Sequence, residues 1–290
     1  LGKERVFETT PITYKKGLFK ELHLVNEYLS SFQSENRVPN HGFDDVTESV
    51  KRLKIENSFI ETVAFLKIAA TSLTVNEHLT FFKKFKVQFP TFFDLTQKIE
   101  FTRYIDDEIK KIIELSGEVK NNASSRLKQI RKDINHVRGK IGVSFTSALS
   151  KSIGAGFLDD IKETVVDNQR VLAVKAMYRR KVSGSLLGSS KSGGIVYIAP
   201  QATLAYSREY QNLVYEEKQE VIKILRELAT TIRPMTSLLE EYLAYLTHID
   251  AVGAKAKYAK EINAVLPKIS KEKKIYFKNA VHPVLWRKNM

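Results

Sequence analysis

The amino-acid sequence predicts a mainly α-helical protein in which a small antiparallel β unit is inserted at the tip of two long antiparallel helices. Three observations lead to this fold class. Glycine and proline are scarce, with 13 and 7 residues among 290, which disfavours a loop-rich all-β protein. Two long segments repeat apolar residues at helical spacing. The segment between them contains short apolar runs separated by turn residues, which is typical of strands.

The N-terminal part of the chain, residues 1–122, predicts a core of short helices. Apolar residues recur there at intervals of three and four, which is the spacing of one helix face. The expected helices are Lys15–Phe32, Asp44–Leu53, Ser58–Leu73 and Lys98–Leu115. Asn57–Ser58 can cap the third helix, and Ser116–Gly117 ends the fourth.

A stronger helical signal follows Asn121–Ser124, residues that can cap a helix. The apolar residues then advance in steps of three and four, close to a heptad seam, and the opposite face is rich in lysine and arginine. The seam consists of Leu127, Ile130, Ile134, Val137, Ile141, Phe145 and Leu149. A helix over Ser124–Ile153 would be about 45 Å long at 1.5 Å per residue. We place the first long helix within residues 123–160.

Residues 161–200 predict a unit of about four strands, because the apolar period changes after the glycines of Ser152–Gly156. The expected strands are Thr164–Val166, Arg170–Val174, Gly184–Gly188 and Ile195–Ala199. Asp167–Gln169 and Ser189–Gly194 are the turns between them. We therefore expect two hairpins.

The helical spacing resumes after Pro200 and continues over residues 201–250, with a kink expected at Pro234. Because the two long helices flank one β unit, we expect an antiparallel stalk with the sheet at its tip. Residues 251–290 are expected to form a C-terminal segment of the core. Its expected elements are a helix over Ala251–Leu266, a strand over Lys274–Phe277 and a turn at His282–Pro283.

Positive charge is concentrated in the middle of the sequence. The chain has 47 Lys and Arg against 33 Asp and Glu, a net charge of +14, and residues 121–200 alone hold 14 basic and five acidic side chains. Such a local excess predicts a polyanionic partner. The basic residues nearest the predicted strands and turns are the candidate phosphate contacts: Lys175, Arg179, Arg180, Lys181, Lys191 and Arg170.

This cluster of basic residues has two possible interpretations. Charges on an edge strand discourage pairing with other chains, but one or two suffice for that purpose. A cluster of one sign at the end of a long arm is better explained as a phosphate contact surface. Only Tyr178 and Tyr197 are interleaved with the basic residues, so base stacking on single strands is not favoured. The expected partner is double-stranded nucleic acid, bound without sequence preference.

The sequence indicates no catalytic or metal site. It contains no cysteine, which excludes disulfides and thiolate chemistry and fits a reducing cytosol, and its six histidines are scattered. The glycine-rich turn Gly188–Gly194 departs from a nucleotide-binding loop, because Ser190 rather than glycine precedes Lys191 and a strand is expected next. The longest apolar runs are too short to span a membrane. We expect a cytoplasmic protein that is not an enzyme in this portion.

Short motifs occur in a specific order over residues 115–290. They are Gly117–Val119, Ala123–Ser124, Leu127, Ile130–Arg131, Arg170–Val171, Val174–Ala176, Tyr178–Arg179, Val182, Gly184, Ser190, Ser192–Gly193, Val196–Ile198, Pro200, Asp250, Ala254–Ala256, Ala259 and His282–Leu285. Leu1–Arg5 and the helices after it add to the set. The set resembles the MutS family of DNA mismatch repair ATPases, and it is closest to the second bacterial MutS-like, anti-recombination subfamily.

The resemblance implies a helical core, two lever helices (123–160 and 201–250) and a β clamp (161–200) that closes on duplex DNA. In the family an ATPase domain follows the His–Pro segment, which implies that this portion has no cofactor of its own and that ATP and Mg²⁺ act in the full-length parent. A nuclease tail occurs in many members. Phe59–Glu61 matches the mismatch-reading F-x-E motif only by chance, and we expect it to pack within an amphipathic helix.

The resemblance further implies a homodimer that holds double-stranded or branched DNA, associated with the nucleoid, in mismatch repair or in the suppression of recombination. Two other functions fit the same residues. The long helices could form a coiled-coil scaffold that binds other proteins. The positive charge could also serve a structured RNA such as ribosomal RNA.

Overall fold

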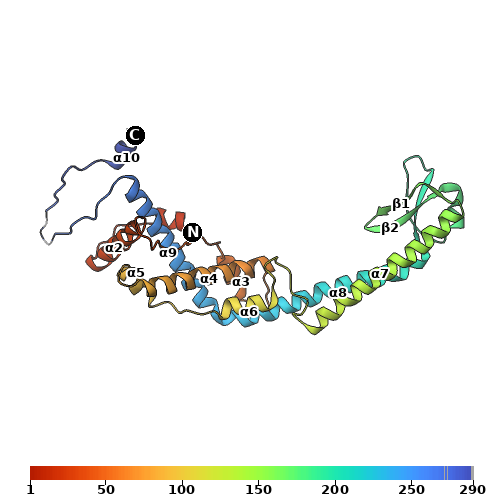
Figure 1. Ribbon diagram of the computed structural model, residues 1–290, viewed down its shortest axis with the longest axis horizontal. Coiled ribbons are helices and arrows are strands. Elements are labelled where there is room, and N and C mark those ends of the chain that lie inside the picture. Colours follow the sequence, from red (N-terminus) through yellow and green to blue (C-terminus); the bar gives the residue numbers. More distant parts are fainter. Residues whose placement is uncertain (271, 273, 289–290) are drawn as a thin grey trace. The chain divides into compact units, whose positions relative to one another are not determined.

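The computed structural model describes residues 1–270, 272 and 274–288 (Figure 1). It confirms the predicted fold class, since the described residues are mainly helical and contain one four-stranded antiparallel sheet. The chain forms two compact units. Unit 1 combines Leu1–Glu118 with the residues from Leu225 onward, and unit 2 is the continuous segment Val119–Ile224.

Unit 1 is a helical core organised around its last long helix. Its helices are α1 (Gly2–Phe7), α2 (Lys15–Ser31), α3 (Thr47–Leu53), α4 (Thr62–Lys84), α5 (Pro90–Thr96), α6 (Tyr104–Ile112), α9 (Thr236–Glu261) and α10 (Pro283–Lys288). The helix α9 packs against α1, α2, α3 and α4, and its Leu246 and Ile249 are fully buried. Aromatic rings fill the space between α4 and α5, where Phe82 stacks on Phe92 with 4.6 Å between centroids.

The helix α4 is longer than predicted and starts later. It begins at Thr62, so Phe59–Glu61 precedes the helix, and the expectation that this segment is helical was wrong. Ile60 is nonetheless buried, as expected for a segment that packs. The helix continues beyond Leu73 to Lys84, because Val75, Leu79 and Phe82 extend the buried face at the same three- and four-residue spacing.

The region around Lys98–Leu115 also differs from the prediction. The helix α6 covers only Tyr104–Ile112, and the preceding residues form a loop held by tertiary contacts. The Tyr242 hydroxyl donates a 2.6 Å hydrogen bond to the Glu100 carbonyl, and Asn76 Nδ2 donates one of 2.7 Å to the Thr102 carbonyl. These bonds satisfy carbonyls that a helix would have used, so the helix begins after them.

The C-terminal expectations were partly wrong. The helix α9 runs through residue 250 without a break, so Ala251–Leu266 is not a separate helix. No strand exists over Lys274–Phe277, and among the described residues no other strand lies beside this segment to pair with it. The expected turn at His282–Pro283 is the start of α10, with proline at a position that helices tolerate.

The helix α5 was not predicted, and a buried carboxylate explains its formation. Glu27 of α2 is 9% exposed, and its two oxygens accept hydrogen bonds from the backbone N–H groups of Thr91 and Phe92, at 2.9 and 3.2 Å. These groups belong to the first turn of α5, which Pro90 opens. A side chain distant in the sequence therefore caps this helix.

Replacing Glu27 with alanine is expected to lower the free energy of unfolding by about 2 kcal/mol, because two N–H groups at the start of α5 lose their acceptors. Urea denaturation followed by circular dichroism measures this loss. The exposed Glu35 provides the control, since Glu35→Ala should change the stability by no more than about 0.5 kcal/mol. Equal effects of the two substitutions would contradict the capping role.

A buried polar network joins separate segments of unit 1. His78 of α4 is fully buried, with Nδ1 3.2 Å from the Tyr245 hydroxyl and Nε2 3.2 Å from the Asn40 carbonyl. The carbonyl can only accept, so Nε2 carries the proton and Nδ1 accepts from Tyr245. The His41 ring contacts that of His78 edge to face, and its Nε2 lies 3.4 Å from Asp250 Oδ1. Burial lowers the pKa of His78 to about 4.

Unit 2 contains α7 (Ser125–Gly154), the sheet, and the first part of α8 (Gln201–Ile232). As predicted, Ser124 caps α7, because its Oγ accepts a 2.9 Å hydrogen bond from the Leu127 N–H. Side-chain contacts show that α7 and α8 run antiparallel (Figure 1). Residues further along α7 contact residues that come earlier in α8. The pairs are Ser124–Glu220, Arg131–Glu217, Arg138–Tyr210 and Lys140–Tyr206.

The second long helical segment is interrupted near the predicted position. The helix α8 ends at Ile232, a 3-10 turn spans Arg233–Met235, and α9 begins at Thr236. Pro234 lies in this turn, where its missing N–H removes one hydrogen bond of the helix. The Arg233 side chain donates a 2.8 Å hydrogen bond to the Leu53 carbonyl and so ties the interruption to α3.

Candidate nucleic-acid interface

The sheet of unit 2 begins with a tight hairpin. Strand β1 (Leu158–Val166) pairs with β2 (Gln169–Lys175), and Val166 lies opposite Gln169, so only Asp167 and Asn168 form the turn. Both turn residues have positive φ, 47° and 58°, which Asn and Asp tolerate better than other side chains. The strand β1 starts before the predicted unit and carries an irregularity between Leu158 and Glu163.

The four strands are ordered β1-β2-β4-β3, with β3 at Gly184–Ser189 and β4 at Ile195–Pro200. Apolar side chains from α7 and the sheet form a small core: Phe145, Leu158, Leu172, Val174, Val182 and Ile198. The rings of Phe157 and Tyr178 pack at the edge of this core, with centroids 5.0 Å apart. Because Tyr178 lies in the 3-10 segment η1 (Ala176–Lys181), this contact holds η1 in place.

The glycine-rich turn between β3 and β4 is a closed hairpin turn. The Ser190 N–H donates to the Ile195 carbonyl and the Gly193 N–H to the Ser190 carbonyl, both at 2.9 Å. A strand follows the turn, as predicted, and a nucleotide-binding loop would require a helix there. The Ala176 N–H donates to the Gly194 carbonyl at 2.9 Å, so the start of η1 lies beside this turn.

Five of the predicted phosphate contacts lie at different places along the sheet, from one end of β4 to the other. Lys175 pairs with Ile195 at one end of β4, next to the turn that carries Lys191. The segment η1 then passes to the other end of β4, since Gly184, shortly after it, pairs with Pro200. Arg179, Arg180 and Lys181 lie on this segment. Six residues of β4 correspond to about 20 Å of strand.

These five side chains are available to a ligand. Lys175, Arg180, Lys181 and Lys191 are exposed and Arg179 is half-buried. Within the described part of the chain, no carboxylate forms an ion pair with any of the five. Their charge is therefore compensated only by solvent and counterions, which is the condition for exchanging counterions against phosphates.

Arg170 is placed differently from the other five. Alternate residues of a strand share a face, so Arg170 lies on the side of Leu172 and Val174, whereas Lys175 lies on the opposite side. Its guanidinium is 2.6 Å from a Glu163 carboxylate oxygen and 4.2 Å from the Phe145 ring centroid. Arg170 therefore contributes to the packing of the sheet on α7.

A cavity of about 450 Å³ lies where α7 ends, η1 crosses and α8 begins. Lys181 and Lys151 both line it, together with Ser183 and Gln201, and no acidic residue is in its wall. Lys151 is one of the 14 basic side chains of residues 121–200, but no role was predicted for it. Its position at the end of the predicted long helix, next to the β unit, was the signal that could have identified it.

Two classes of site are absent from the described residues. No group of three or more His, Cys, Asp or Glu side chains there could hold a metal ion. Among the helices of the described residues, none is both long and apolar enough to cross a bilayer.

No family model matches the chain, but individual proteins do. Endonuclease MutS2 of Lactobacillus acidophilus is 31% identical over 253 residues, which are 87% of this chain and 32% of that protein. Endonuclease MutS2 of Alkaliphilus oremlandii is 26% identical over 287 residues, 98% of this chain and 36% of that protein. The putative endonuclease MutS2 of Bacillus subtilis is 27% identical over 288 residues, 98% and 37% of the two chains.

The chain thus spans about one third of the length of the curated relatives it matches. The similarity extends over nearly all of the chain and includes both units. It agrees with the ordered motifs found in the sequence. The chain belongs to the MutS family and, within it, groups with the proteins named MutS2.

Proposed function

We propose that this chain is a part of a MutS-like DNA repair or anti-recombination protein that binds double-stranded or branched DNA without sequence preference. The relatives are named endonucleases, which implies a nucleic-acid substrate for those proteins. The observation that carries the proposal is the row of five cations along η1, the end of β2 and the β3–β4 turn, none of which has an ion pair among the described residues. A row of this kind matches a duplex backbone, whose phosphates repeat at regular intervals.

Several features of the binding surface favour a backbone over bases. The only aromatic side chain of η1, Tyr178, packs on Phe157 and is engaged in the core. The sheet presents few other groups for stacking, so single strands would gain little. Lysine and arginine contacts to phosphates position a protein on a duplex but carry no sequence information.

We propose the remaining roles for the whole protein. Residues 123–160 and 201–250 act as levers and 161–200 as a clamp, in a homodimer whose ATPase domain uses ATP and Mg²⁺. This chain then contributes DNA binding and no catalytic residue, while the nuclease activity implied by the relatives' names belongs to another part of the protein. The assignment of levers and clamp stays a prediction about function.

The salt dependence of binding tests the proposal. If all five cations contact phosphates, the logarithm of the association constant should fall against the logarithm of salt concentration with a slope of about −4.5. Fluorescence anisotropy with a labelled duplex, between roughly 50 and 300 mM salt, measures this slope. A slope near zero, or no binding at the lowest salt, would contradict the proposal.

Competition separates DNA from RNA at this surface. An unlabelled DNA duplex should displace the labelled probe at lower concentration than an RNA duplex of the same sequence. Displacement by RNA at the lower concentration would favour a structured-RNA partner instead. A chain that binds neither and dimerises along its helices would be a scaffold.

A further inference from the structure

A second basic surface lies in unit 2 on the side of α7, away from the sheet. A cavity of about 410 Å³ opens between α7, the segment before it and α8. Four cationic side chains line it, Lys128, Arg131, Lys132 and Arg138, against one carboxylate, Glu217. Ile134 is the one apolar residue in its wall. The cavity is therefore suited to an anion and offers no platform for a base.

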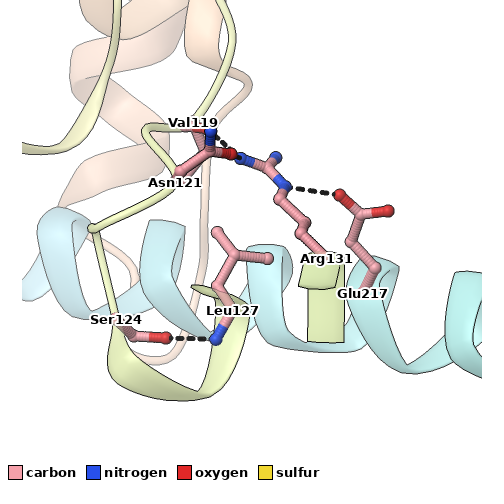
Figure 2. A network of polar contacts seen from close by, with 6 residues as sticks. All are labelled: Val119, Asn121, Ser124, Leu127, Arg131 and Glu217. Atoms are coloured by element: carbon pink, nitrogen blue, oxygen red, sulfur yellow. Dashed lines mark hydrogen bonds and ion pairs between the residues drawn. The ribbon is translucent and has the colours of Figure 1, made fainter. Parts of the chain in front are cut away.

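Arg131 is held in a fixed orientation at this cavity (Figure 2). Its Nε donates to Glu217 Oε1 at 2.7 Å, and its Nη1 donates to the Val119 carbonyl at 2.8 Å and to Asn121 Oδ1 at 2.5 Å. Within the described residues these bonds leave the Nη2 group without a protein acceptor. A pre-oriented guanidinium binds a phosphate at a lower entropic cost than a freely rotating side chain.

The carboxylates of α8 compensate only part of the positive charge of α7. Glu217 pairs with Arg131 and Glu216 pairs with Arg126, at 2.7 and 2.6 Å. The only acid of α7, Asp133, accepts a hydrogen bond from the Gln129 amide. Lys128 and Lys132 are exposed and have no ion pair among the described residues. The cavity lining therefore keeps an excess of positive charge even though Glu217 is part of it.

We propose that this cavity, here called the groove, binds the phosphodiester backbone of a nucleic acid at a place separate from the sheet. Lys128 and Lys132 are one turn apart, about 6 Å along the helix, and Arg138 lies about 9 Å further. One strand of a duplex carries a phosphate every ~3.4 Å of its rise, so the three cations match phosphates two to three nucleotides apart. The side-chain amides of Asn121 and Asn135 add hydrogen-bonding groups in the wall.

The groove and the sheet surface are distinct contacts within one unit. Arg131 and Lys151 are 20 residues apart on the same helix, which corresponds to about 30 Å, or roughly nine base pairs of duplex. This inference rests on the proposed function, because it assigns a second contact to the same class of partner. Both contacts serve either one duplex that runs along α7 or two arms of a branched DNA.

Charge reversal at Lys128→Glu and Lys132→Glu tests the groove in the full chain. Duplex binding at about 100 mM salt should weaken roughly 10- to 60-fold, and the magnitude of the salt slope should fall by about 2. The matched control is Arg208→Glu with Lys218→Glu, two exposed cations of α8 outside the cavity wall. It changes the net charge equally and should weaken binding less than about threefold. Circular dichroism verifies that both variants keep the helix content of the unaltered chain.

The outcomes separate this inference from the proposed function. If both double variants weaken binding equally, the effect is only the general field of the protein, and the groove is not a contact. If charge reversals in η1 abolish binding while the groove variant is unaffected, the proposed function survives and this inference fails. If the groove variant loses affinity for poly-glutamate but not for a duplex, the groove receives an acidic protein segment, which also overturns the assignment. A chain that binds no duplex at low salt would overturn both.

Discussion

Reversing the three charges of η1, with Arg179→Glu, Arg180→Glu and Lys181→Glu, is expected to weaken duplex binding roughly 500-fold or more at about 100 mM salt. Each lost phosphate contact removes about 0.9 from the magnitude of the salt slope, so the magnitude should fall by about 2.7. The three side chains lack carboxylate partners among the described residues, so their removal breaks no ion pair. Anisotropy titrations over a series of salt concentrations give both quantities.

The fold of the β unit should survive this change. Tyr178 and Val182, on either side of the three cations, attach η1 to the core, and neither is altered. A triple reversal at Lys83, Lys86 and Lys98 is the matched control, because these are exposed cations of unit 1. The control should retain affinity within about fivefold. If the η1 variant bound a duplex as tightly as the control, with an unchanged slope, the interface would lie elsewhere.

The stability of unit 1 is expected to decrease by about 3 kcal/mol as the pH falls from 6.5 to 4, because of His78. Burial lowers the pKa of this histidine from 6.5 to about 4 in the folded chain. Below pH 6.5 the unfolded chain therefore binds a proton that the folded chain does not, and acid favours unfolding. Above pH 6.5 both states are neutral and the contribution is constant. Urea denaturation at several pH values measures the dependence.

Two variants identify the group responsible. His78→Leu should remove most of this pH dependence, although it lowers stability at pH 8 because the Tyr245 hydroxyl and the Asn40 carbonyl lose a partner. His136→Gln, at an exposed position of α7, should leave the pH dependence unchanged. A pH dependence that persists in His78→Leu would assign the effect to groups other than His78.

Unit 2 was largely predictable from the sequence because its signals are local. The heptad-like spacing and the cap at Ser124 specified α7, and the turn residues specified both hairpins. Unit 1 was less predictable, because distant residues decide where its helices begin and end. The cap of α5 is Glu27 of another helix, and the loop before α6 is held by Tyr242. A local pattern contains neither contact.

The candidate interface shows the same limit. The sequence identified where positive charge is concentrated, but not which of the basic side chains are exposed and which are paired or packed. Arg170 and Lys175 look alike in the sequence, yet the alternation of the strand places one over Phe145 and leaves the other exposed. Arg131 was recognised only as part of a basic face, because its partner Glu217 is separated from it by the entire β unit. Pairing of this kind depends on the register of α7 against α8.

Unit 1 is formed by two separate segments of the chain, and this has a consequence for its biosynthesis. Its central helix α9 is made after unit 2, although it contacts α1, α2, α3 and α4, which are made first. The earliest helices must therefore leave the ribosome without their main packing partner, while the continuous unit 2 can fold as soon as α8 emerges. Chains usually mature from the N-terminus onward. Here unit 2 can complete its fold before unit 1, because α9, the central helix of unit 1, is synthesised after all of unit 2.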